Sequence, residues 1–173
     1  STAPGGYAWV IPKKGGANIG IGIQKKYAKG KNLKLKSEEF FSKFEGKITY
    51  QGSGALPMSG TISTLSKGNC MLVGDSAGMV LPSNGAGITT AMIGGRIAGE
   101  AIANHIVKGE SLEEYQINWE KEMGKVMKYS KRGIRWGGLM FRSPDWLVNT
   151  SFNPLSKSFI WRAVTCRPVL GIY

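Results

Sequence analysis

The sequence predicts a mixed α/β protein, α+β in arrangement, built from a strand hairpin, a strand–loop–helix segment and a helical carboxyl-terminal region. Three observations support this order. Two short apolar runs flank a glycine-containing turn, a later apolar strand ends in Gly-Asp before a glycine-rich loop, and the last third carries helix caps. We expect a sheet with a short helix over residues 1–66, the strand–loop–helix over 67–108, and helices over 109–173.

The hairpin is predicted by apolar runs at 7–11 and 18–23, which the turn-forming sequence Pro-Lys-Lys-Gly-Gly separates. Side chains alternate along a strand, so Tyr7, Trp9 and Ile11 share one face. Aromatic residues in this pattern are more often part of a core than of a ligand pocket, and from the pattern alone both remain open.

The segment after the hairpin is rich in lysine and is predicted to be a loop. A short amphipathic helix is expected over 37–45, where phenylalanines supply the apolar side. The stretch 47–66 mixes β-branched residues with Gly, Ser and Pro, which indicates strand and loop.

A compact apolar strand is predicted over 70–73, and a long helix is expected from the loop at 82–85 to about Val107. This helix contains many small residues, and glycine inside a helix costs about 1 kcal/mol. We therefore expect its small face, through Thr90, Gly94 and Ala98, to pack closely against the sheet or against a half of the protein that is missing from this chain. Charged residues interrupt the apolar run at intervals, which excludes a membrane span.

The last third is predicted to be helical. Ser111 and Glu114 form a capping box for a helix that should end near Arg132. Ser143-Pro144 and Asn153-Pro154 each combine an N-cap with proline at the first helical position, so two short helices should begin there.

Composition excludes several classes of protein. Cys70 and Cys166 are too few for a disulfide framework or a zinc site and are interpreted as reduced thiols of a cytoplasmic protein. His105 has no partner at metal-ligand spacing, so no metal site is expected. The sequence shows no signal or transit peptide, and we expect it to be part of a longer protein.

Net charge is +12, and the excess of lysine and arginine is concentrated in two clusters. Such clusters suit an anionic membrane surface, nucleic acid or a solvated face, but no nucleic-acid-binding motif accompanies them, so no nucleic acid is expected. The clusters are Lys25, Lys26, Lys29, Lys31, Lys34 and Lys36, and Lys121, Lys125, Lys128, Lys131, Arg132 and Arg135.

The strand–loop–helix segment is the most informative for chemistry. The carboxylate of Asp75, directly after a strand, suits the hydroxyl groups of a sugar or ribityl chain. A helix start near Ala86 to Ile88 offers unpaired N–H groups to anionic oxygens. This spacing resembles the second flavin-binding motif of the para-hydroxybenzoate hydroxylase-like flavoproteins, in particular the geranylgeranyl reductase family. The resemblance implies FAD binding at Gly74, Asp75, Pro82, Gly85, Ala86, Gly87 and Ile88.

The hairpin resembles the same family. Its Tyr-x-Trp-x-Phe-Pro motif, followed by Gly-x-Gly, has its counterpart here with isoleucine in place of phenylalanine. The resemblance implies an isoprenoid substrate site at Tyr7, Trp9, Ile11, Pro12, Gly20 and Gly22.

One part of the family pattern is absent. No G-x-G-x-x-G sequence follows a strand anywhere in the chain. The resemblance therefore implies that this chain holds half of an FAD site and that an amino-terminal half supplies the fingerprint.

The activity implied is reduction of isoprenoid double bonds of a membrane lipid or its precursor, with electrons from NAD(P)H or ferredoxin. The sequence offers no residue that we assign as the proton donor. We expect a cytoplasmic protein, peripheral at the membrane surface. A related flavin monooxygenase or electron-transfer flavoprotein dehydrogenase is the alternative enzyme, and a basic lipid-surface-binding module is the non-enzyme alternative.

Overall fold

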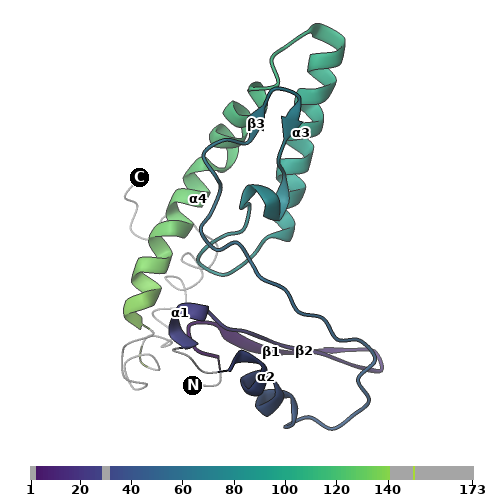
Figure 1. Cartoon of the computed structure of the whole chain (residues 1–173), viewed down its shortest axis with the longest axis vertical. Helices are drawn as coiled ribbons and strands as arrows, with labels where there is room; N and C mark the ends of the chain where they lie inside the picture. The colour runs from purple at the N-terminus through teal and green to yellow at the C-terminus, as the bar shows by residue number, and fades with distance from the viewer. Residues whose placement is uncertain (1–2, 29–31, 141–149, 151–173) are drawn as a thin grey trace. The chain divides into compact units, whose positions relative to one another are not determined.

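The computed structural model describes residues 3–28, 32–140 and 150 of the chain. The chain divides into two compact units, Ser1–Ser53 and Gly54–Tyr173. The described residues form small antiparallel sheets and α-helices (Figure 1), so the predicted mixed α/β class is confirmed. The division into 1–66, 67–108 and 109–173, which we assign from the sequence to a substrate domain, the carboxyl-terminal part of an FAD-binding domain and a helical region, stays a prediction.

The first unit is built on the predicted hairpin. Strands β1 (Tyr7–Lys13) and β2 (Gly16–Gly22) pair antiparallel from Tyr7↔Gly22 to Lys13↔Gly16. The strands run further into the turn than the sequence suggested, because Gly15, at φ 77°, allows a two-residue turn that the twist of the strands favours.

Two helices follow the hairpin, where one was expected. Helix α1 (Lys25–Ala28) occupies part of the stretch predicted to be a loop. Helix α2 (Leu33–Phe41) overlaps the predicted range 37–45 but begins and ends earlier than predicted. The start of α2 is set by Asn32, whose Oδ1 accepts hydrogen bonds from the backbone N–H groups of the next helical turn. The prediction followed the phenylalanine spacing and overlooked this cap.

The second unit begins with a long loop and a short β-hairpin. Strand β3 (Ser66–Lys67) pairs with β4 (Cys70–Met71), and the 3₁₀-helix η1 (Gly74–Ala77) follows. The strand predicted over 70–73 is present but shorter, since it ends at Met71. The stretch 47–66 is almost entirely loop, so the strand content expected there is wrong except at its last residue.

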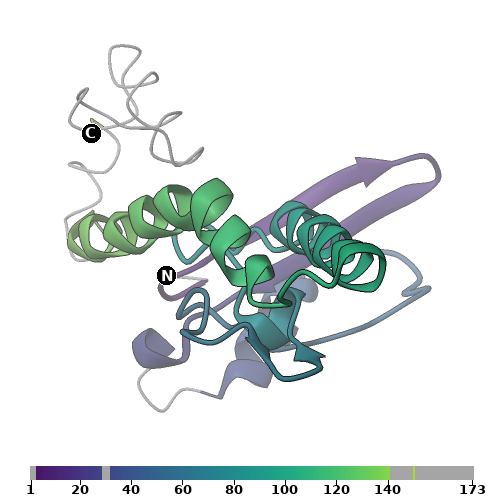
Figure 2. The ribbon, with the colours of Figure 1, turned by 90° about the horizontal axis from the view of Figure 1, so that it is seen from above.

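Two long helices complete the second unit and lie side by side in Figures 1 and 2. Helix α3 (Ile88–Lys108) ends within one residue of the predicted end. Helix α4 (Glu114–Met140) begins two residues after the start that the predicted capping box implies, with Ser111 Oγ accepting a 3.2 Å hydrogen bond from the N–H of Glu113, and it continues well past the predicted end. The two short helices expected at Ser143-Pro144 and Asn153-Pro154 lie outside the described residues.

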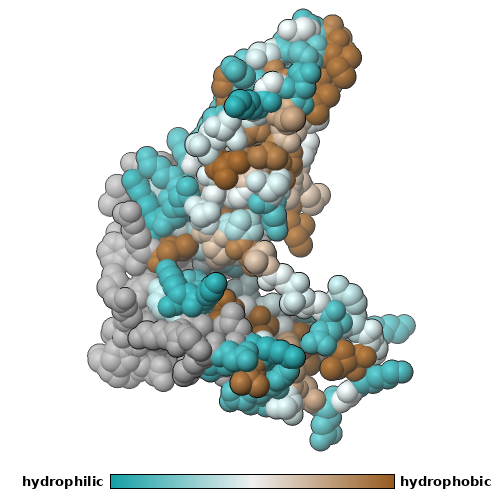
Figure 3. Space-filling model, viewed as in Figure 1, coloured by the Kyte–Doolittle hydropathy of each residue, from teal (hydrophilic) through white to brown (hydrophobic). Residues whose placement is uncertain are grey.

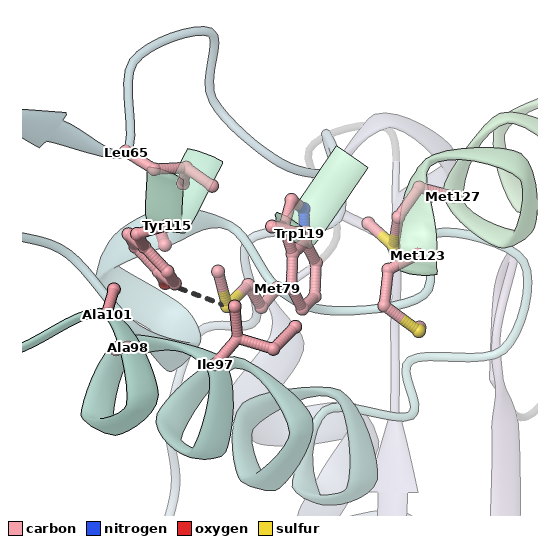
Figure 4. Packing of buried hydrophobic residues seen from close by; sticks show 10 residues of the cluster. Leu65, Met79, Ile97, Ala98, Ala101, Tyr115, Trp119, Met123 and Met127 are labelled. Atoms are coloured by element: carbon pink, nitrogen blue, oxygen red, sulfur yellow. Dashed lines mark hydrogen bonds between the residues drawn. The ribbon is translucent and has the colours of Figure 1, made fainter. Parts of the chain in front are cut away.

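The core of the second unit lies between α3, α4 and the loop that follows η1 (Figure 4). Trp119 and Tyr115 of α4 are 1% and 0% exposed and pack with Met79 and Ile97. Large aromatic side chains dominate the energetics of such cores. Helices α3 and α4 therefore support η1, which contains Asp75, and the loop that follows it.

A polar contact joins the same helices at the surface. Arg96 of α3 donates hydrogen bonds of 2.7 and 2.6 Å to the carboxylate of Glu122 on α4, and one of 2.9 Å to Glu100. The bonds to Glu122, and then those to Glu100, raise the pKa of Arg96. The charged residues that interrupt α3 thus pair at the surface. No helix in the described ranges is long and apolar enough to cross a membrane.

Tyr115 makes the stability of this core sensitive to alkaline pH. Its hydroxyl donates a 2.8 Å hydrogen bond to the carbonyl of Leu72, and burial raises the pKa of Tyr115 to about 12. Between the unfolded pKa of about 10 and pH 12, the unfolded state loses a proton that the folded state keeps, so stability falls as pH rises. We expect a loss of about 2 kcal/mol over this interval, measured by urea unfolding.

Tyr115→Phe is the control for this prediction, because lysines and other tyrosines also titrate above pH 10. The variant should be less stable at pH 8, since the Leu72 carbonyl loses its donor, and its stability should fall less steeply above pH 10. A variant with the same alkaline slope as the parent would show that Tyr115 is not responsible.

Candidate functional site

The predicted ligand Asp75 lies in the tight turn after β4. Gly74 adopts a φ of 68°, a left-handed conformation that favours glycine, and this turns the chain out of the strand. The N–H of Met79 donates a 3.0 Å hydrogen bond to the carbonyl of Gly74, which closes η1. Within this closed turn the side chain of Asp75 is exposed, so its carboxylate is available to a ligand.

The loop from Leu81 to Ala86 is held by its own hydrogen bonds. Asn84 Oδ1 accepts a 2.9 Å hydrogen bond from the N–H of Ala86, and the N–H of Leu81 donates to the Ala86 carbonyl at 2.9 Å. Pro82 is fully buried, and a methyl group built on Gly85 would lie 3.5 Å from Leu56 Cδ1. Pro82 and Gly85 therefore shape the loop, while Ala86 is at its exposed end.

The loop places the first residues of α3 beside Asp75. Gly87 is the N-cap of α3 and provides no side-chain cap for the first N–H groups of the helix. A methyl group at this position would lie 3.7 Å from Asp75 Oδ1 and 3.2 Å from Val80 Cγ2. The carboxylate and the uncapped helix start are thus neighbours, and Ile88, 81% exposed, lies at the same end.

This arrangement can bind two kinds of oxygen. The carboxylate accepts hydrogen bonds from hydroxyl groups, and the helix start donates to carbonyl or anionic oxygens, helped by the helix dipole. Five of the predicted cofactor residues are brought together here, and Pro82 and Gly85 support them from behind. The five are Gly74, Asp75, Ala86, Gly87 and Ile88.

Sequence reasoning missed two residues that fix this geometry. The hydroxyl of Thr90 lies within hydrogen-bond distance of the carbonyls of Met79 and Gly87. It therefore connects the first turn of α3 to Met79, in the segment that follows η1. Met79 is fully buried beneath the turn. A threonine in the first turn of a helix is a recognisable signal for such a bond to the preceding turn, but the partner Met79 carries no local signal.

The hairpin holds the second predicted group. The indole of Trp9 extends across β2 over its cross-strand partner Gly20, whose lack of a side chain leaves the space that the ring fills. Trp9 Nε1 donates a 2.8 Å hydrogen bond to Asn18 Oδ1, which fixes the ring. Asn18 was not predicted, although alternation places it on the face of Trp9.

Tyr7 and Ile11 complete this face and remain 58% and 57% exposed. The rings of Tyr7 and Trp9 are 5.7 Å apart and tilted by 50°. Gly22 pairs with Tyr7, whereas Pro12 is at an alternate position and belongs to the opposite face. The hairpin face of Tyr7, Trp9 and Ile11 is therefore an aromatic and apolar surface that the first unit leaves uncovered.

The two groups of predicted residues lie in different units of the chain, the hairpin face in the first and the Asp75 turn in the second. Nothing in the described residues gathers three or more His, Cys, Asp or Glu side chains at a metal-binding distance. Cys70, the cysteine within the described ranges, is a free thiol.

Comparisons with known proteins identify similar proteins over most of the chain. The model of the geranylgeranyl reductase catalytic domain matches residues 1–53. A digeranylgeranylglycerophospholipid reductase of Methanocella arvoryzae is 43% identical over 132 residues, which are 72% of this chain and 34% of the relative. A reductase of the same description from Methanocaldococcus jannaschii is 31% identical over an alignment 192 residues long, which covers 99% of this chain and 47% of the relative.

A solved structure shares the fold. A geranylgeranyl bacteriochlorophyll reductase-like protein from Thermoplasma acidophilum aligns with a TM-score of 0.72 and 23% identity, over 91% of this chain and 41% of that protein. The chain thus spans between a third and a half of the length of these proteins.

Proposed function

Because this chain belongs to the geranylgeranyl reductase family, we propose that it works as the carboxyl-terminal part of an FAD-dependent enzyme that reduces isoprenoid double bonds in a membrane lipid or its precursor. The observation that supports this most directly is the pairing of the exposed Asp75 carboxylate with the uncapped start of α3. That pairing suits a ligand with both hydroxyl groups and electron-rich oxygens, as a flavin has.

The residues at the Asp75 turn fit FAD in two respects. Asp75 would accept hydrogen bonds from the ribityl chain, and the N–H groups after Gly87 would donate to oxygens of the flavin. The absence of a side chain at Gly87 leaves space beside Asp75, since a methyl group there would lie 3.2 Å from Val80 Cγ2 and 3.7 Å from Asp75 Oδ1. FAD, when bound, supplies the hydride for the alkene, and NAD(P)H or ferredoxin would supply the electrons.

The hairpin face would hold the isoprenoid. An isolated alkene accepts hydride poorly unless it is protonated, so positive charge develops on the more substituted carbon. The rings of Tyr7 and Trp9 can stabilise such a charge by cation–π attraction, worth about 2 kcal/mol where water is excluded. The bond from Trp9 to Asn18 keeps the ring in place without reorganisation during the reaction.

Substitution of Asp75 tests the flavin proposal. In a longer polypeptide that also contains the amino-terminal part found in the relatives, called the full-length polypeptide below, we expect Asp75→Ala to weaken FAD binding about tenfold or more, because hydrogen bonds to a charged group are lost. The measurement is flavin absorbance per protein after gel filtration. Ser76→Ala is the matched control, since Ser76 is exposed in the same turn and bonds only to the Val73 carbonyl. Full flavin retention with lost turnover in Asp75→Ala would instead indicate acid–base chemistry.

The basic clusters support a second part of the proposal, attraction to an anionic membrane that contains the substrate. Lys121, Lys125 and Lys128 are exposed along α4 and have no ion-pair partner among the described residues. Lys25 and Lys26 are exposed on α1. Each basic side chain near such a surface contributes about 1 kcal/mol, and salt screens the attraction.

Liposome flotation tests this attraction. The full-length polypeptide should float with anionic liposomes at low salt and lose most of this binding at about 0.5 M salt, where screening is strong. Replacing Lys121, Lys125 and Lys128 by glutamine should lower the binding further at low salt. Equal binding to neutral and anionic liposomes would assign the clusters to a solvated surface.

A further inference from the structure

Helix α4 has a buried stripe that includes one serine. The stripe consists of residues that recur every three or four positions and are at most 7% exposed: Tyr115, Trp119, Met123, Met127 and Ser130. The other side of the helix is polar, and Figure 3 shows hydrophilic side chains on the edge of α4 away from α3. A buried hydroxyl group costs free energy unless it is hydrogen-bonded. Ser130 therefore needs a polar partner within the unit.

The partner of Ser130 is Ser83, in the loop that leads to the start of α3. Ser130 Oγ accepts a 3.0 Å hydrogen bond from the N–H of Ser83 and lies 2.9 Å from Ser83 Oγ. The backbone of α4 also approaches this loop, since a methyl group on Gly133 would lie 3.4 Å from Ser83 Cβ. Helix α4 therefore contacts the loop both by a hydrogen bond to its backbone and by close packing.

The bond to Ser130 differs from the other backbone bonds of this loop. Four N–H groups donate to atoms within 81–86 itself, and these are the groups of Leu81, Asn84, Gly85 and Ala86. They set the shape of the loop. The N–H of Ser83 instead donates to a side chain 47 residues later in the sequence. This bond therefore determines where the shaped loop lies in the unit.

We propose that Ser130 is a positioning residue for the flavin. By holding the Ser83 peptide, it holds the turn that leads to Gly87 and so the uncapped N–H groups that lie beside Asp75. A hydrogen bond weakens steeply when its distance or angle departs from the favoured range, so a loop that shifts binds the flavin oxygens less tightly. This inference rests on the proposed function, because it concerns the affinity for FAD.

Substitution in the full-length polypeptide tests this role. Ser130→Ala leaves the Ser83 N–H without its acceptor, and we expect the Kd for FAD to rise about tenfold. The measurement is titration of the flavin-free protein with FAD, followed by quenching of flavin fluorescence. Met123→Ala is the control, because it truncates a side chain two turns earlier in the same stripe. It should lower the melting temperature more than Ser130→Ala does, yet change the Kd by less than about twofold.

Amide exchange in the 173-residue chain gives a second measurement that does not require flavin. The Ser83 amide proton should exchange at least about tenfold faster in Ser130→Ala than in the parent. An unchanged exchange rate, or a rise in Kd that follows the loss of stability equally in Ser130→Ala and Met123→Ala, would overturn the positioning role. A parent that binds FAD with the same Kd as Ser130→Ala would overturn this inference alone. A parent that binds no FAD would contradict the proposed function itself.

Discussion

Gly94→Leu should destabilise the second unit by about 3 kcal/mol and lower its melting temperature by about 10 °C. The first added carbon alone would lie 2.5 Å from Met79 Sδ and 3.5 Å from Trp119 Cζ3. Met79 and Trp119 are both fully buried, so neither side chain can move aside into solvent. Thermal unfolding of the 173-residue chain, followed by circular dichroism, measures the effect.

Gly95→Leu is the control, because it makes the same chemical change one residue further along α3. The first added carbon here would meet nothing within 4 Å, and leucine forms helices better than glycine. The melting temperature of this variant should stay unchanged or rise. Similar losses in both variants would show that backbone effects, and not contact with Met79 and Trp119, limit the substitution.

The small face of α3 illustrates what the sequence could and could not predict. Thr90, Gly94 and Ala98 were expected to pack closely, and all three are buried. Their partner was expected to be the sheet or the missing amino-terminal half, and this is wrong, since Gly94 meets Met79 and Trp119 of the same unit. Composition shows that a helix face is small, but the identity of its partner depends on contacts distant in sequence.

The local elements were predicted where the signal was also local. The hairpin followed from glycines in a short turn, and the start of α4 followed from its serine cap. The errors arose where one local pattern was followed and another determined the structure. Phenylalanine spacing over 37–45 concealed the Asn32 cap, and the β-branched residues of 47–66 found no strand to pair with.

The candidate site shows the same limit. Asp75 and Gly87 could be singled out because their residue types and spacing match a ligand-binding turn. Asn18 and the positioning role of Thr90 were overlooked because both depend on contacts, with Trp9 and with Met79, that only the folded chain reveals. The sequence therefore indicates the residues that would contact a ligand more readily than the residues that hold them in position, because the second group is recognised only by its tertiary contacts.

Trp9→Leu should lower turnover of a geranylgeranyl lipid in the full-length polypeptide by about 100-fold or shift its chain-length preference, since small displacements of a bound reactant carry penalties of this size. Stability should change little, because the face of Tyr7 and Ile11 beside it is exposed and contributes few core contacts. Val10→Ala, on the opposite face of β1 and 46% exposed, is the matched control and should leave turnover nearly unchanged.

A second substitution separates the ring's chemistry from its position. Gly20→Val leaves Trp9 in the sequence but fills the space under the indole, so the ring must move away from β2 and lose its bond to Asn18. If the held position of the ring matters, Gly20→Val should lower turnover as Trp9→Leu does. A core role predicts the reverse, a loss of about 3 to 5 kcal/mol on truncating Trp9 to alanine with unchanged rates. Early melting of Trp9→Leu together with normal turnover would therefore remove the hairpin face from the substrate site.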